Sequence, residues 1–142
     1  MAQRMIIMQG ASGSGKTTKA NELAAEIDAL VYSTDDFHME DDKYIFKPSK
    51  LSEYHAANQR RTREAIKSGK SVIIDNTNIN NWQAKIYVKI ALEFGITPEF
   101  VRCEGKFANL HGVPEDKVED MRKNLEELTV EKCLDSKAPW EK

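Results

Sequence analysis

One short stretch constrains this chain more than any other: GASGSGKTT, at residues 10–18, which directly follows the apolar run MIIMQ. It fits the pattern G-x-x-x-x-G-K-[ST], with Gly10, Gly15, Lys16 and Thr17 at the fixed positions. In such a loop the glycines let backbone N–H groups turn toward phosphate oxygens, the lysine adds a point charge and the threonine hydroxyl binds Mg²⁺. A strand before the loop and a helix after it are the expected context, so we predict a site for a nucleoside triphosphate. The residues predicted to hold the nucleotide are Gly10, Ser12, Gly13, Ser14, Gly15, Lys16, Thr17 and Thr18.

The rest of the chain alternates between strand and helix patterns. Strands are expected at residues 4–9, 29–33, 71–75 and 98–103, and helices at 16–27, 51–68 and 80–94. This alternation predicts an α/β fold of three layers, in which a parallel sheet of about four strands is flanked by helices. At 142 residues, the chain is expected to form one domain over residues 1–142.

Two segments complete this prediction. Residues 36–50 are polar and contain Pro48, so we expect a long irregular loop. Pro114 is expected to open a last helix, because apolar residues follow it at helical spacing. Those residues are Val118, Met121, Leu125 and Leu128.

Composition narrows the choice of protein class. The net charge of −2 argues against a broad basic surface for duplex DNA. Only two cysteines are present, which indicates neither a disulfide framework nor a zinc site and suits a reducing cytosol. The N-terminal apolar run is too short for a signal peptide, and no run is long enough to cross a membrane. We therefore expect a cytoplasmic protein.

Acidic residues follow the second and third predicted strands. Parallel strands end at one edge of a sheet, so the phosphate loop and residues 34–36, 75–78 and 104–106 are expected to share one crevice. A carboxylate there could take the proton of an attacking hydroxyl; we assign this role to Asp35, with Asp36 as its competitor. An Asx turn or helix cap is the alternative reading of the pair. Asp75 is predicted to hold Mg²⁺ through water, unless it is only a turn residue.

The helix predicted at 51–68 has polar residues on its inward face. His55 and Asn58 either brace the DNTN loop at residues 75–78 or touch a ligand. Arg60, Arg63 and Lys67 form a basic row, which is either a solvated face or a path for a nucleic-acid backbone.

Taken together, these motifs resemble the polynucleotide-kinase-like branch of AAA-type P-loop kinases. The matching pieces are GASGSGKTT, STDDF, HAANQRRTREAIKSGKSVIIDNTN and HGVP, in that order, and they span most of the chain. The resemblance implies that Asp35 is the general base toward a 5′-hydroxyl, with Lys16 at the γ-phosphate and Thr17 at the magnesium. It also implies a short lid at about residues 104–112.

Three positions depart from the family pattern. In the lid, this sequence has Ala108–Asn109 where the family commonly has Arg-Asn. Lys106 is then the remaining cation of the lid. His38 stands three places after the catalytic aspartate, where the family often has an arginine. Asn76 stands before the TN pair, where the family often has a carboxylate. The catalytic residues we predict are Asp35, Lys16 and Lys106, the metal ligands are Thr17 and Asp75, and the acceptor contacts are Asp36, His38, Arg60, Arg63 and Asn78.

The sequence thus favours a kinase that uses ATP and Mg²⁺ and phosphorylates a hydroxyl, most readily at a nucleic-acid 5′ end. Two alternatives stay open: a kinase for a nucleoside, modified base or other small alcohol, and a nucleotide-binding module with little catalysis. The donor base is not specified by any motif, although Trp140 could either stack on a base or plug the core.

Overall fold

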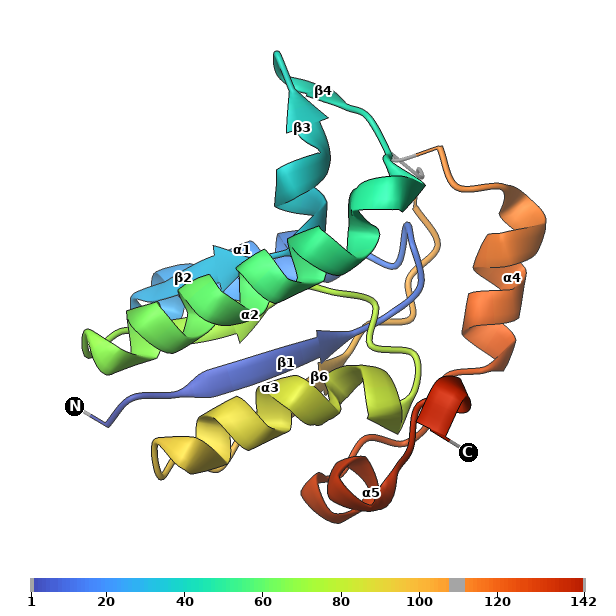
Figure 1. The fold of residues 1–142 in the computed structure, drawn as a ribbon. Helices are drawn as coiled ribbons and strands as arrows, with labels where there is room; N and C mark the ends of the chain where they lie inside the picture. Colours follow the sequence, from blue (N-terminus) through green and yellow to red (C-terminus); the bar gives the residue numbers. More distant parts are fainter. Residues whose placement is uncertain (1, 108–111, 142) are drawn as a thin grey trace.

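The computed structural model describes residues 2–107 and 112–141. Its centre is a four-stranded parallel sheet in the order β2-β5-β1-β6 (Figure 1). The strands are β1 (Met5–Gln9), β2 (Ala29–Tyr32), β5 (Ser71–Ile74) and β6 (Glu99–Arg102). The helices are α1 (Lys16–Ile27), α2 (Leu51–Lys67), α3 (Asn81–Glu93), α4 (Glu115–Lys123) and α5 (Val130–Asp135). The three-layer α/β fold predicted from the sequence is confirmed.

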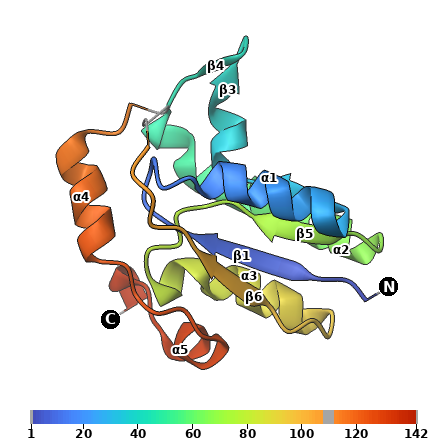
Figure 2. The same cartoon turned by 180° about the vertical axis from the view of Figure 1, so that it is seen from behind.

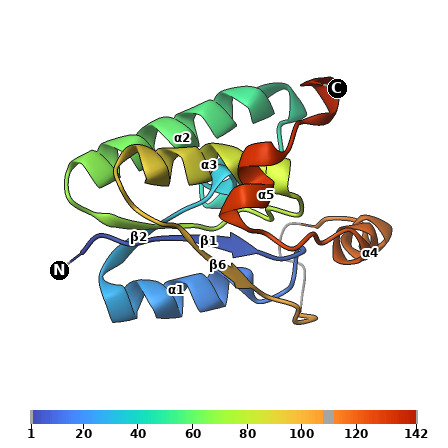
Figure 3. The ribbon, with the colours of Figure 1, turned by 90° about the horizontal axis from the view of Figure 1, so that it is seen from below.

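Alternate residues of β1 supply the two halves of the core. Met5 and Ile7 pack in the cluster that includes α2 and α3, whereas Ile6 and Met8 pack with Ala20 of α1. This division follows from the period of two along a strand. Accordingly, Figure 3 shows α1 on one side of the sheet and α2 and α3 on the other. With both faces covered, the strand ends at one edge are left to form a site.

The long last helix predicted from Pro114 is wrong in its second half. Helix α4 ends at Lys123, and Leu125 and Leu128 lie in a non-helical segment before α5. Tertiary hydrogen bonds explain the break: the Glu126 N–H donates to Ile79 O at 2.9 Å, and the Glu126 carbonyl accepts from the Gln9 side chain at 2.7 Å. Leu128 is still buried in the main core, so the spacing identified its burial but not its conformation.

The segment predicted to be irregular, 36–50, has more order than expected. It continues the 3₁₀ helix η1 (Thr34–His38) into a small hairpin of β3 (Met39–Glu40) and β4 (Lys43–Tyr44), and then the 3₁₀ helix η2 (Pro48–Lys50). Asp41 and Asp42 form the hairpin turn with φ of 48° and 63°. Aspartate tolerates this left-handed backbone, so two adjacent aspartates can make the turn that usually attracts glycine. The hairpin projects beyond the sheet edge (Figures 1 and 2).

Within the part of the chain that the structure describes, no helix combines the length and apolar character needed to cross a membrane.

Candidate active site

The phosphate loop joins β1 to α1 in a glycine-dependent conformation. Gly13 and Gly15 have φ of 79° and 85°, values that side chains with a Cβ rarely adopt. Helix α1 begins immediately afterwards at Lys16, as predicted. The positive end of its dipole therefore adjoins the loop, in the arrangement that binds phosphate groups.

Lys16, Thr17 and Asp75 form a compact polar group beside the loop. The Thr17 hydroxyl donates to Asp75 Oδ2 at 2.7 Å, and Lys16 Nζ lies 3.3 Å from Asp75 Oδ1. The Asp75 side chain is only 5% exposed. A hydroxyl and a buried carboxylate are hard oxygen donors that fit Mg²⁺, which usually takes few protein ligands and adds phosphate oxygens and water. The structure thus brings the two predicted metal ligands together.

The four loops expected at one sheet edge do converge there. The Gly10 N–H donates to Thr77 O at 3.0 Å, which joins the phosphate loop to the loop after β5. The Thr34 N–H donates to Asn76 Oδ1 at 2.9 Å, and the Gly105 N–H donates to Ser14 O at 3.1 Å. Hydrogen bonds to backbone and side-chain acceptors therefore tie all four segments together at this end of the sheet.

Asn78 does not fit the acceptor contact predicted for it. Its side chain is buried, and Nδ2 donates to Met8 O at 2.8 Å and to Asn76 O at 3.3 Å. Its φ of 44° is one that asparagine tolerates better than most residues. Asn78 is therefore a structural residue that fastens the loop after β5 to the end of β1.

Asp35 lies at the start of η1, directly after β2, and is half-buried. The Tyr44 hydroxyl, which belongs to the hairpin, donates to Asp35 Oδ1 at 3.2 Å. Burial, together with the nearby Asp35 charge, raises the pKa of Tyr44 to about 12, so this hydroxyl stays protonated and remains a donor at neutral pH. The hairpin therefore helps to orient the carboxylate that we predict to be the general base.

Asp36, the competitor of Asp35, serves a different purpose. Its Oδ2 accepts from the Ser33 N–H at 3.2 Å, in a capping box that starts η1, and from the Arg61 guanidinium at 2.7 Å. These contacts turn the Asp36 carboxylate toward the helix cap. Asp36 thus has a structural role in the cap, but its carboxylate is 52% exposed, so its contact with the acceptor stays a prediction. Because the Asp35 side chain is not part of that capping box, it is the better candidate for the base.

Arg61, like Tyr44, was not identified from the sequence. Besides Asp36, its guanidinium donates to Ser33 O at 3.0 Å and lies over the rings of Tyr32 and Phe37, at 4.1 and 4.5 Å from their centroids. It thus holds η1 against α2. Its place three residues after Asn58, on the same helical face, was the available signal.

His38 is fully buried and cannot touch an acceptor in this conformation. Its Nδ1 accepts from the Lys47 N–H at 3.1 Å, and its carbonyl accepts from the Ile45 N–H at 2.8 Å. Its ring packs against three aromatic rings, those of Tyr44, Phe46 and Tyr54, with centroids 4.7–5.8 Å away. The predicted acceptor contact is therefore wrong, and His38 instead anchors the hairpin that carries Tyr44.

His55 and Asn58 both act as braces, the first of the two roles left open by the sequence. His55 Nδ1 lies 3.1 Å from Thr34 Oγ1, and Asn58 Nδ2 donates to the Tyr87 hydroxyl at 2.8 Å. Thr34 in turn bonds Asn76, so the brace reaches the DNTN loop indirectly. Burial lowers the pKa of His55 despite the nearby Asp35 charge, which favours a neutral imidazole.

Arg60 and Arg63 lie away from this crevice. They line an open groove of about 600 Å³ with Lys67, Glu93 and Phe94, and Arg63 pairs with Glu93 at 3.2 Å. Glu93 ends α3 and precedes β6, so the groove belongs to the opposite edge of the sheet. The predicted contact of Arg60 and Arg63 with an acceptor at the crevice is therefore not supported by their position.

Only part of the predicted lid can be placed. Lys106 is exposed on the segment that follows β6, and the backbone of this segment bonds the phosphate loop through Gly105 and Phe107. Ala108 and Asn109, where the family pattern has Arg-Asn, lie outside the described residues. Lys106 thus lies on a segment bonded to the phosphate loop, and its catalytic role stays a prediction.

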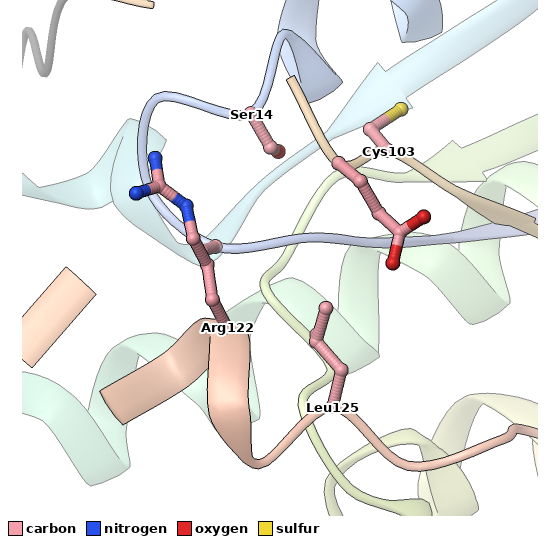
Figure 4. Close-up of a pocket in the computed structure, with 6 residues that line it drawn as sticks. Ser14, Cys103, Arg122 and Leu125 are labelled. Atoms are coloured by element: carbon pink, nitrogen blue, oxygen red, sulfur yellow. The ribbon is translucent and has the colours of Figure 1, made fainter. Parts of the chain in front are cut away.

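A small cavity of about 190 Å³ adjoins the phosphate loop. Figure 4 shows Arg122 of α4 and Leu125 of the segment after it extending toward the loop that carries Ser14, with Cys103 on the far side. Of the residues that line it, Ser14 and Arg122 have buried atoms, Oγ and Nε, without a hydrogen-bond partner; elsewhere in the described residues the same holds for His38 Nε2 and Asn80 Oδ1. Burial raises the pKa of the Cys103 thiol, so the cavity does not activate it as a nucleophile.

The sheet order, the glycine loop and the Lys16–Thr17–Asp75 group together define a P-loop, kinase-like nucleotide-binding domain. Residues 5–128 match the AAA domain family, and the chain belongs to that family. It is 32% identical, over 128 residues, to human NEDD4-binding protein 2, an alignment that covers 82% of this chain. The chain spans only 7% of the length of that relative.

Two solved structures share the fold. A chain of the Pnkp1/Rnl/Hen1 complex matches with a TM-score of 0.62 and 22% identity, covering 83% of this chain and 38% of that one. Kti12 from Chaetomium thermophilum, solved in complex with ADP-AlF3, matches with a TM-score of 0.61 and 15% identity, covering 87% of this chain and 80% of that one. The resemblance to P-loop kinases inferred from the sequence is confirmed.

Proposed function

We propose that this protein is an ATP- and Mg²⁺-dependent kinase that transfers the γ-phosphate to a hydroxyl group, at the 5′ end of a nucleic acid. The observation that supports it is a pairing at one sheet edge. The Lys16–Thr17–Asp75 group, which fits phosphate and metal, lies at the same end of the parallel strands as a separate half-buried carboxylate, Asp35. Phosphoryl transfer requires both a clamp on the phosphates and a group that orients the attacking hydroxyl.

On the donor side, the loop amides and Lys16 would hold the triphosphate. Thr17 and Asp75 would hold Mg²⁺, which supplies charge neutralisation between the phosphates. Lys16 is paired with Asp75 at 3.3 Å, which places the lysine charge beside the predicted metal ligand. Lys106 is the nearest described lid cation, and a lysine is a weaker partner for phosphate than an arginine, so we expect slow turnover.

On the acceptor side, Asp35 would accept the proton of the attacking hydroxyl. The acceptor oxygen forms a bond to the γ-phosphorus, the bond from that phosphorus to the bridging oxygen of ADP breaks, and the proton passes to the Asp35 carboxylate. Tyr44 would hold the carboxylate in place through its hydroxyl. This arrangement needs no movement of Asp36, which is engaged in the helix cap.

The choice of a nucleic-acid 5′ end rests on the family resemblance and on the structural match to a chain of the Pnkp1/Rnl/Hen1 complex. One observation favours a second candidate, a nucleoside or other small alcohol. His38 replaces the arginine that would contact an acceptor phosphate, and its burial leaves that contact unmade. An oligonucleotide acceptor should therefore show little dependence on a 3′-phosphate.

A matched pair of substitutions tests the assignment of the base. Asn keeps the shape of Asp but cannot take a proton at neutral pH. Asp35→Asn should leave ATP affinity nearly unchanged and cut phosphoryl transfer by about 10²–10⁴, the usual cost of losing a general base. Asp36→Asn should cost much less, because Asp36 caps η1. Near-normal transfer in Asp35→Asn with collapse in Asp36→Asn would sink the assignment.

A further inference from the structure

Phe107 is placed unusually for a phenylalanine. It lies in the segment after β6, where this segment runs beside the phosphate loop, and the residue is 69% exposed. Its backbone is nevertheless fixed, because the Phe107 N–H donates to Gly13 O at 2.7 Å and the Gly105 N–H donates to Ser14 O at 3.1 Å. Two hydrogen bonds to the phosphate loop therefore hold an exposed aromatic ring at the rim of the nucleotide site.

The Phe107 ring packs against two glycines, Gly15 and Gly105. A Cβ on Gly15 would lie 2.9 Å from Phe107 Cε2, and a Cβ on Gly105 would lie 2.3 Å from the same atom. Any side chain at either position would displace the ring, so these glycines provide the surface on which the ring lies. Since the ring contacts the loop through the glycines and yet stays mostly exposed, much of its π surface is open to solvent.

The geometry points to Phe107 as the stacking platform for the base of the donor nucleotide, an inference that rests on the nucleotide binding proposed above. The loop fixes the phosphates, and the base is joined to them through one ribose, so the base must lie near the rim of the loop. An aromatic ring fixed at that rim with an open surface offers the contact that a base can use. Trp140, the aromatic residue considered from the sequence, is instead packed edge-on against Trp82, with ring centroids 5.1 Å apart.

Stacking also predicts the donor preference. Every base has a π face, so stacking does not read hydrogen-bonding groups, but it gains from the larger area of a purine. ATP and GTP should therefore bind with similar affinity, and UTP and CTP should bind more weakly. This makes Phe107 a specificity-determining residue for base size rather than for base identity.

Calorimetry with a fixed set of ligands tests this. For Phe107→Ala we expect ATP affinity to fall by about 5- to 150-fold, the range that corresponds to the loss of one stacked base. Affinity for inorganic tripolyphosphate, which has no base, should be unchanged, and the preference for ATP over UTP should collapse. Phe107→Trp should retain ATP binding, and Trp140→Ala, at another exposed aromatic residue, should behave as the parent protein.

Three results would overturn the inference: unchanged ATP affinity in Phe107→Ala, an equal loss for ATP and tripolyphosphate, or an unaltered ratio of ATP to UTP affinity. The ratio keeps the test valid even if tripolyphosphate binds the parent too weakly to measure. Because only binding is measured, failure here is distinct from failure of the kinase proposal. A protein that binds ATP through Phe107 but transfers no phosphate would contradict only the latter.

Discussion

The donor half and the acceptor half of the crevice are built by different means. The donor half comes from one contiguous loop, whose backbone makes the phosphate cradle, and from a single carboxylate, Asp75, that bonds Lys16 and Thr17. The acceptor half depends on side chains from separate segments: Asp35 is oriented by Tyr44, and the hairpin that carries Tyr44 is anchored by His38. One half is specified by a pattern of residues, and the other by packing.

This difference has a consequence for variation. The phosphate cradle tolerates few changes, because Gly13 and Gly15 adopt φ values that residues with a Cβ rarely adopt. The acceptor half can change its shape through the hairpin, since the hairpin is joined to the sheet mainly through η1 and the ring cluster around His38. We therefore expect substitutions in the two halves to have separable effects on ATP binding and on acceptor use.

The largest effect, on both stability and acceptor use, is expected at His38. His38→Ala removes a fully buried ring that contacts three others and accepts the Lys47 N–H. Large-to-small substitutions at buried sites cost about 2–5 kcal/mol, so the free energy of unfolding should fall by that amount in denaturant titrations. Transfer should weaken because Tyr44 loses its support, while ATP affinity should stay near that of the parent.

Phe46→Ala is the matched control for His38. Phe46 contacts the same ring at a centroid distance of 5.0 Å but is itself about half exposed, so its loss should cost far less stability. Equal losses of stability in the two variants, or a large loss of ATP affinity in His38→Ala, would break the distinction between the halves.

The next effect in size is expected at Lys16. Lys16→Ala removes a charged donor to the outer phosphates, worth about 1.5–3 kcal/mol, so Mg·ATP affinity should fall by about 10- to 150-fold in calorimetry. The fold should be preserved, because Asp75 retains the Thr17 hydrogen bond. Lys19→Ala, an exposed lysine one turn further along α1, is the control and should bind ATP normally. Equal affinity in Lys16→Ala and the parent would refute the phosphate-loop assignment.

The smallest effect concerns pH and His55. Burial lowers the pKa of His55 below its ordinary value of 6.5. The unfolded chain then binds a proton that the folded chain does not, so this stabilisation is present above about pH 6.5 and is lost as the pH falls through the folded pKa. His55→Gln should therefore lose less stability than the parent between pH 7 and pH 5 in thermal melts. Identical slopes would show that folding does not disfavour protonation of His55.

Much of the fold could be predicted from the sequence because its signals are local. Buried strands, α1 from Lys16 to Ile27 and the phosphate loop follow from apolar periodicity and glycine chemistry within a few residues. The end of α4 could not be predicted in this way. Glu126 leaves the helix because Gln9 and Ile79, more than forty residues away, bond its backbone.

The site was predictable to a different degree in its two halves. Asp75 and Thr17 met as expected, because a parallel sheet forces strand ends together. His38 was misassigned because a histidine has both a polar edge and an apolar ring, and sequence alone does not say which one the fold uses. Arg61 was overlooked because its neighbours Arg60 and Arg63 suggested a charged surface, whereas its contacts with Tyr32 and Phe37 appear only once α2 packs on η1.

We propose that the two halves act together as a kinase on a hydroxyl at a nucleic-acid 5′ end. The most direct measurement is transfer of label from γ-labelled ATP, with Mg²⁺, to a panel of acceptors: a short single-stranded oligonucleotide with a free 5′-hydroxyl, the same oligonucleotide already phosphorylated at its 5′ end, nucleosides and small alcohols. We expect slow labelling of the 5′-hydroxyl oligonucleotide that depends on Lys16 and Asp35, and no label on the phosphorylated control. Label on nucleosides or small alcohols alone, or on no acceptor at all, would contradict this proposal.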